Sequence, residues 1–257
     1  MSVINSFFSA FLMYSKIPMP RTEWKEENRR YALCFFPLIG AVCGGLIVLW
    51  YYICSKLNIG NILFAAGCTA IPAAVTGGIH LDGFCDVCDA KSSWGGREKM
   101  LEIMNDSHIG AFAAIKLCLY LIIQTALFTE IFDKKLLMIF GAGMVLSRAL
   151  SGLAAVTFKS AKNGGALQNF VKPAHKRITV ASEILIIILN CGIMIISDSF
   201  VGIAAILGGF TAFAYYRIFS YRRFGGITGD LAGWFLQICE LAILLCIVLS
   251  HKLMEVL

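Results

Sequence analysis

The chain has 257 residues, of which 58% are hydrophobic and 15% are charged, and its formal net charge is +6. Soluble domains carry roughly 25% charged residues, so this composition excludes a collagen, a disordered chain and a nucleic-acid-binding module. The basic residues stand in short stretches between apolar runs, where lipid headgroups account for them, and no nucleic-acid partner is expected. We therefore interpret residues 1–257 as a single integral membrane domain.

The order of apolar runs predicts an all-α fold, a polytopic membrane helical bundle. Residues 1–20 show no signal-peptide pattern, and their apolar and aromatic content before Pro18 and Pro20 predicts an interfacial or re-entrant helix. A membrane-crossing helix needs about 20 apolar residues. Seven runs of about that length follow: Leu33–Cys54, Asn58–Ile79, Ile109–Thr129, Leu136–Phe158, Ile178–Ser197, Phe200–Tyr216 and Leu231–Ser250.

The connections between these runs differ in charge. Of the 22 Lys and Arg residues, 17 fall on the side of the N-terminal segment when Lys116, near the start of the third run, is counted with the connection before it; four fall on the other side, and Arg148 lies inside a run. Because basic connections stay in the cytoplasm, we predict a cytoplasmic N-terminus. The connections at residues 80–108, 159–177 and 217–230 are then cytoplasmic too, and an active site made of polar loops would lie there.

The most informative stretch runs from Gly77 to Asp89, where the second apolar run ends. At 100° per residue, Asp82, Asp86 and Asp89 share one narrow stripe of a helix, where they repel one another unless a cation neutralises them. Oxygen ligands without imidazole favour Mg²⁺, which often completes its shell with substrate phosphates, so the pattern predicts phosphate or diphosphate chemistry. The alternative is that these aspartates cap a helix and face water. In a continuous helix His80 would face away from Asp82, so a role for His80 requires that it lie before the helix proper, for example at its N-terminal turn.

A second polar stretch precedes the last apolar run. Gly226 and Asp230 follow directly on Arg222 and Arg223. Flexible glycines with exposed backbone N–H groups beside arginines can cradle phosphate oxygens. The alternative, a turn followed by a helix cap, is equally compatible with the sequence.

Other ionisable residues are candidates by their position. Asp106 and His108 stand just before the third run, where a catalytic pair and an ordinary helix cap, with Asp106 or Ser107 as the N-cap, are equally supported. Arg148, Glu183 and Glu240 lie inside apolar runs, where charged groups are functional candidates by default. We take Arg148 as a candidate substrate-binding residue.

The segment Gly77-Gly78-Ile79-His80-Leu81-Asp82-Gly83, continued by Asp86 and Asp89, resembles the signature G-G-x-H-L-D-G-x-x-D-x-x-D of the cobalamin synthase family, also called adenosylcobinamide-GDP ribazoletransferases. Four other segments resemble that family: Lys16–Pro20, Phe36–Gly40, Met104–Gly110 and Gly226–Asp230. Ala90 departs from the glycine that many members carry there, but it is no proposed ligand.

The resemblance implies a multispanning enzyme of a bacterial or archaeal inner membrane, surrounded by lipid, with its active site on the cytoplasmic side. It would join adenosylcobinamide-GDP to α-ribazole, or its 5′-phosphate, release GMP and use Mg²⁺. Our assignment gives Asp82, Asp86 and Asp89 to Mg²⁺, with Asp230 or Asp106 completing the shell, His80 or His108 accepting the hydroxyl proton, and Arg222, Arg223, Gly226 and Arg148 binding substrate.

Two other functions compete with this interpretation. A CDP-alcohol phosphotransferase also places aspartates at a membrane face, but its D-G-x-x-A-R run is not met, because Arg97 lies well past Asp82. A cation transporter would use Glu183 and Glu240 near the middle of the membrane. The small residues at 40–45 and 202–209 predict tight helix packing within or between subunits, which leaves a homo-oligomer open.

Overall fold

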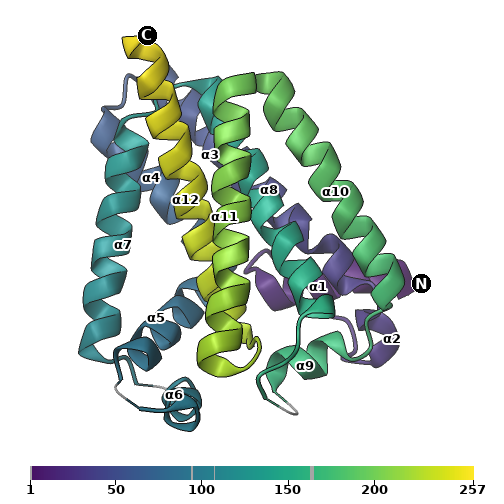
Figure 1. The fold of residues 1–257 in the computed structure, drawn as a ribbon. Helices are drawn as coiled ribbons and strands as arrows, with labels where there is room; N and C mark the ends of the chain where they lie inside the picture. The colour runs from purple at the N-terminus through teal and green to yellow at the C-terminus, as the bar shows by residue number, and fades with distance from the viewer. Residues whose placement is uncertain (1, 94, 107, 163–164) are drawn as a thin grey trace.

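The computed structural model describes residues 2–93, 95–106, 108–162 and 165–257. These residues form the helices α1 (Ser2–Tyr14), α2 (Glu26–Arg29), the 3-10 helix η1 (Ala32–Phe35), α3 (Phe36–Leu57), α4 (Asn61–Thr76), α5 (Ile79–Ser92), α6 (Arg97–Ile103), α7 (Ala111–Thr129), α8 (Lys134–Thr157), α9 (Ala166–Val171), α10 (Lys176–Ser197), α11 (Ser199–Phe224) and α12 (Gly229–Val256). The all-α class and the helical bundle are confirmed, and Figure 1 shows the short α1 lying across the long helices.

Six helical segments of the described chain are long and apolar enough to cross a membrane, and they contain α3, α7, α8, α10, α11 and α12. The second expected crossing differs in its course. Helix α4 has only 16 residues, and α5 turns away from it by 96°. The break lies at Gly77 and Gly78, whose φ angles of 64° and 79° are left-handed. Glycine adopts this conformation without steric cost, so the apolar run ends in a sharp turn, and α4 with α5 forms a seventh crossing only if the bent pair is counted as one span.

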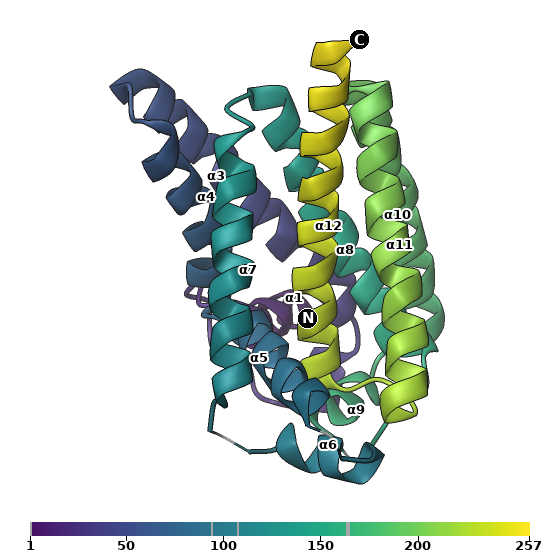
Figure 2. The same cartoon turned by 60° about the vertical axis from the view of Figure 1, so that its left-hand side comes forward.

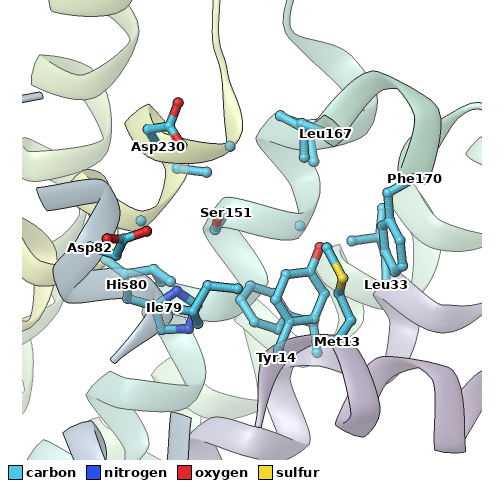
Figure 3. Close-up of a pocket in the computed structure, with 17 residues that line it drawn as sticks. Met13, Tyr14, Leu33, Ile79, His80, Asp82, Ser151, Leu167, Phe170 and Asp230 are labelled. Carbon is cyan, nitrogen blue, oxygen red and sulfur yellow. The ribbon is translucent and has the colours of Figure 1, made fainter. Parts of the chain in front are cut away.

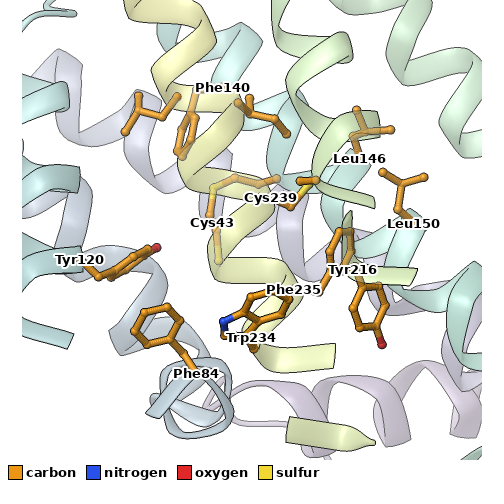
Figure 4. Packing of buried hydrophobic residues seen from close by; sticks show 14 of the residues in the cluster. Cys43, Phe84, Tyr120, Phe140, Leu146, Leu150, Tyr216, Trp234, Phe235 and Cys239 are labelled. Atoms are coloured by element: carbon orange, nitrogen blue, oxygen red, sulfur yellow. The ribbon is translucent and has the colours of Figure 1, made fainter. Parts of the chain in front are cut away.

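Helices α8 and α12 form the inside of the bundle, whereas α7 and α10 bury much less of their surface. Aromatic and aliphatic side chains fill the space between them (Figure 4), and the rings of Tyr216 and Phe235 stack with centroids 4.7 Å apart. Helix α3 approaches α8 closely, because a Cβ added at Gly44 would lie 2.6 Å from the Cα atom of Gly141. The expected tight glycine packing therefore occurs within the chain at this crossing.

The three polar connections that the charge pattern placed on one side meet at one end of the bundle. The Arg97 guanidinium donates to the Ala161 carbonyl at 3.0 Å, and Ser160 forms a single parallel bridge with Ile227. Figures 1 and 2 show α5, α6 and α9 gathered at this end, opposite the C-terminus. Residues of three distant segments can therefore contribute to one site there.

Candidate functional site

A cavity of about 160 Å³ lies where α5 begins, against α1, α8, α9 and α12. Figure 3 shows its two kinds of wall: His80, Asp82, Ser151 and Asp230 lie toward one side, and Met13, Leu33, Leu167 and Phe170 toward the other. A cavity with one polar and one apolar wall can orient a ligand of the same character. It brings together three of the residues predicted as site residues, namely His80, Asp82 and Asp230.

The turn at Gly77 and Gly78 explains why His80 and Asp82 share this cavity. Gly78 is the N-cap of α5, so both side chains belong to its first turn, and the cavity lies around the start of this helix rather than along one face. The expectation that His80 must lie before the helix proper is wrong, because α5 begins at Ile79 and His80 lies within its first turn, yet the residue still lines the cavity. The His80 ring is 5% exposed and stacks on Tyr14 with centroids 6.4 Å apart.

The His80 ring is neutral and partly unsatisfied. Burial, aided by the charge of Arg148, lowers the pKa of His80 to about 3. Its buried Nε2 atom has no hydrogen-bond partner in the described part of the chain. A neutral imidazole whose nitrogen lacks a partner can accept a hydrogen bond from a ligand hydroxyl.

The acidic residues of α5 and α12 meet because the two helices touch. A Cβ added at Gly83 would lie 2.7 Å from the carbonyl oxygen of Asp230, so only glycine permits this approach. Burial, together with the charges of Asp82, Asp230 and Asp89, raises the pKa of Asp86 to about 7. The carboxylates therefore repel one another at this end of the bundle.

Asp89 has a partner that the sequence interpretation did not foresee. Its two carboxylate oxygens accept hydrogen bonds from the backbone N–H groups of Gly110, at 2.6 Å, and Ala113, at 2.9 Å. These are free donors in the first turn of α7, and an acceptor there stabilises a helix. For Asp89 the helix-cap alternative describes the structure, although the capped helix is a different one.

Asp106 and His108 form a pair outside the cavity. The Asp106 carboxylate accepts from the backbone N–H of His108 and lies 2.7 Å from its ring Nδ1, and these hydrogen bonds lower the pKa of Asp106. The His108 side chain is 89% exposed. Helix α7 has Gly110 as its N-cap, so the expectation that Asp106 caps it is wrong, and Ser107, the other cap candidate, lies outside the described residues.

The residues expected to cradle phosphate are arranged differently. Arg222 and Arg223 are exposed in the last turn of α11 and do not line the cavity. The Gly226 N–H donates to the Ser220 carbonyl, so it is not the free donor that the glycine pattern suggested. The N-cap of α12 is Thr228, which makes the turn-and-cap alternative correct for this loop.

Arg148 is deeply buried beside Glu240. Its side chain is 1% exposed, that of Glu240 is 2% exposed, and the Arg148 Nη1 atom lies 2.5 Å from Glu240 Oε1. Arg148 also donates to the Met144 carbonyl. It lines a small polar pocket next to His80 rather than the larger cavity, so its contacts describe a structural ion pair.

The sequence interpretation missed the apolar wall and the cations near the acids. Tyr14 and Phe170 form part of that wall, but they are far apart in the chain and carry no motif that could have joined them. Lys162 donates to Asn105 Oδ1 at 2.7 Å, and its charge partly offsets the acidic repulsion acting on Asp86. The only sequence feature that could have indicated Lys162 is its position in a basic loop on the same side of the membrane as the acidic helix.

The donor chemistry of Asp82, Asp86 and Asp230 fits Mg²⁺. All three offer carboxylate oxygens, and a divalent cation would relieve the repulsion that raises the pKa of Asp86. Across the described residues, no group of three or more His, Cys, Asp or Glu side chains is already gathered as a ligand set. Mg²⁺ commonly binds through one or two carboxylates, water and substrate phosphates, which is compatible with acids that are close but not assembled.

Comparison with known proteins identifies the family. Residues 6–248 match the family described as cobalamin-5-phosphate synthase. The chain belongs to this family. It is 44% identical over 255 residues to the adenosylcobinamide-GDP ribazoletransferase of Lachnoclostridium phytofermentans, covering 98% of this chain and 96% of the relative. The enzyme of the same name from Clostridium botulinum strain Alaska E43 is 30% identical over 246 residues, covering 93% and 95% of the two chains.

A third relative is the adenosylcobinamide-GDP ribazoletransferase of Clostridium perfringens strain ATCC 13124. It is 31% identical over 235 residues, which cover 89% of this chain and 91% of the relative. No solved structure matches the chain. Membership of this family leaves the CDP-alcohol phosphotransferase and the cation transporter without support. The buried Glu240 that the transporter alternative needed is paired with Arg148.

Proposed function

We infer that this chain is an enzyme that joins adenosylcobinamide-GDP to α-ribazole, or to its 5′-phosphate, and releases GMP late in cobalamin synthesis. The single observation that carries the proposal is the cavity in which Asp82, Asp230 and His80 face an apolar chamber, in a chain of the cobalamin-5-phosphate synthase family. In the reaction, the ribose hydroxyl oxygen attacks the phosphorus that bears the cobinamide arm. The bond from that phosphorus to the oxygen of GMP breaks, and GMP leaves with this oxygen.

The residues around the cavity suit this transfer. We assign the Nε2 atom of His80 as the acceptor of the hydroxyl proton, because it is buried at the cavity without a partner among the described residues. Asp82, Asp86 and Asp230 would hold Mg²⁺, which when bound supplies positive charge to the diphosphate. Lys162 and Arg97 bring fixed positive charge to the same end of the bundle, where a departing phosphate needs it.

We propose that this end of the bundle faces the cytoplasm of a cell with an inner membrane. The N-terminal segment and the three polar connections at this end carry most of the Lys and Arg residues of the chain, and basic connections remain on the cytoplasmic side. A charged nucleotide substrate would then reach the site from water without crossing the membrane.

The experiment is GMP release by the purified protein supplied with adenosylcobinamide-GDP, α-ribazole and a range of Mg²⁺ concentrations. Asp82→Asn keeps the size of the side chain but removes its charge, and we expect kcat to fall at least about 100-fold with a higher Mg²⁺ requirement. Glu27→Gln, a charge removal at an exposed position of α2, is the control and should behave as wild type. Wild-type kinetics in Asp82→Asn would refute the assignment of the acidic group.

A further inference from the structure

The far side of the cavity is closed and apolar. Leu33, Phe36 and Leu236 line it, and they are 2%, 3% and 1% exposed. The cavity opens at the start of α5 and α12, where the lining residues Ile79, Asp82 and Gly229 are exposed. A ligand that fills this cavity must therefore have an apolar, buried part and a polar part that remains at the mouth.

From this shape we infer that the cavity binds the base of the riboside, a flat benzimidazole-type ring system, with the benzo ring innermost and the ribose at the mouth. This inference rests on the proposed function and specifies where one of its substrates binds. An apolar cavity of about 150 Å³ binds benzene, so a cavity of about 160 Å³ has room for the benzo ring, with the imidazole ring toward the mouth.

The other parts of the two substrates fit this space less well. The corrin ring of cobinamide is far larger than the cavity. Guanine is similar in size to a benzimidazole, but it carries several hydrogen-bonding groups on its edges. Leu33, Phe36 and Leu236 offer those groups no side-chain partner, and each polar group buried without a partner costs about 1–3 kcal/mol. A benzimidazole has no polar group on its benzo ring and avoids this cost.

Aromatic side chains give the cavity the geometry for a flat ring. Tyr14 packs edge-on against Phe170 with centroids 5.5 Å apart, and it stacks on His80. All three rings line the cavity. With the base held between these walls, the ribose lies on the side of Asp82 and His80.

Two alanines line the chamber. Ala155 of α8 and Ala232 of α12 both line the cavity, and both are partly buried. A larger side chain at Ala155 would project into the volume that the benzo ring needs. Ala142 lies in the same helix, is also partly buried and does not line the cavity, so Ala142→Leu is a matched control for Ala155→Leu.

The first measurement is binding without catalysis. α-Ribazole alone, at about 100 times its Kd, should raise the Tm of the purified wild type and of Ala142→Leu by about 5 °C or more. In Ala155→Leu the same concentration should produce little shift. An equal shift in Ala155→Leu and wild type would overturn the subsite, as would no shift in any of the three proteins.

The second measurement is steady-state kinetics with both substrates. Ala155→Leu should raise KM for α-ribazole about tenfold or more and leave KM for adenosylcobinamide-GDP within about twofold of wild type, because steric misfit in an apolar pocket has effects of this size. For a riboside with the smaller, single-ring imidazole base, Ala155→Leu should raise KM much less. An equal rise for both substrates would overturn the subsite, whereas α-ribazole binding by a wild type that releases no GMP would refute the proposed function and leave the subsite standing.

Discussion

The buried ion pair of Arg148 and Glu240 permits a quantitative test of its role. Removing one partner leaves a charge without compensation in the bundle interior, which typically costs 3–5 kcal/mol. A chain of this size loses about 2–4 °C of Tm per kcal/mol, so Glu240→Leu and Arg148→Met should each melt about 6–20 °C below wild type. The double variant Arg148→Met with Glu240→Leu should recover most of this loss, because two apolar side chains replace two charges.

The assay is thermal unfolding of the detergent-purified proteins, with Lys135→Met as control. Lys135 pairs with Asp198 at 2.8 Å, but its side chain is 54% exposed, so breaking that pair should cost less than about 1 kcal/mol. The reasoning would be refuted if Glu240→Leu had the same Tm as wild type, or if the Tm of the double variant were as low as those of the single variants. The same double variant tests the sequence prediction for Arg148, because KM for adenosylcobinamide-GDP should rise only if Arg148 binds substrate.

Two further predictions concern glycine packing and the cap of α7. Gly44→Val should destabilise the protein by about 1–3 kcal/mol, because the new side chain would collide with Gly141. A Cβ added at Gly45 meets no atom within 4 Å, so Gly45→Val should be tolerated. Equal Tm values for the two variants would contradict the close α3–α8 crossing. Asp89→Asn keeps one acceptor for the α7 amides and should cost about 1 kcal/mol without changing the Mg²⁺ dependence of GMP release. A Mg²⁺ requirement shifted as far as in Asp82→Asn would return Asp89 to the metal site.

Much of the fold could be predicted from the sequence because the membrane fixes the length of each apolar run. The break after α4 was harder to place, although its cause is visible in two adjacent glycines, Gly77 and Gly78. A scan for apolar length counts residues and cannot detect that α5 turns by 96°. The direction of α5 depends on its packing against α12, which no local pattern records.

The candidate site also has parts that the sequence could predict and parts that it could not. His80 and Asp82 are two residues apart, so a short motif could identify both. Asp230 was found through a motif of its own, but its approach to α5 depends on the contact at Gly83. The partner of Asp89 is the start of α7, which lies 21 residues further along the chain. A stripe on a helical wheel shows which side chains share a face, but not which neighbour that face meets.

The turn at Gly77 and Gly78 also explains how one site can serve two chemically different substrates. If α5 continued straight from α4, it would carry Asp82 and Asp86 away from the bundle and from Asp230. Because α5 instead lies against α12, the carboxylates stay at the end of the bundle, where water and a charged diphosphate can reach them. The same first turn places His80 beside a chamber that extends between α8 and α12, where an apolar base is shielded from water. The proposed transfer requires both environments within a few bonds of each other, and this sharp turn supplies them.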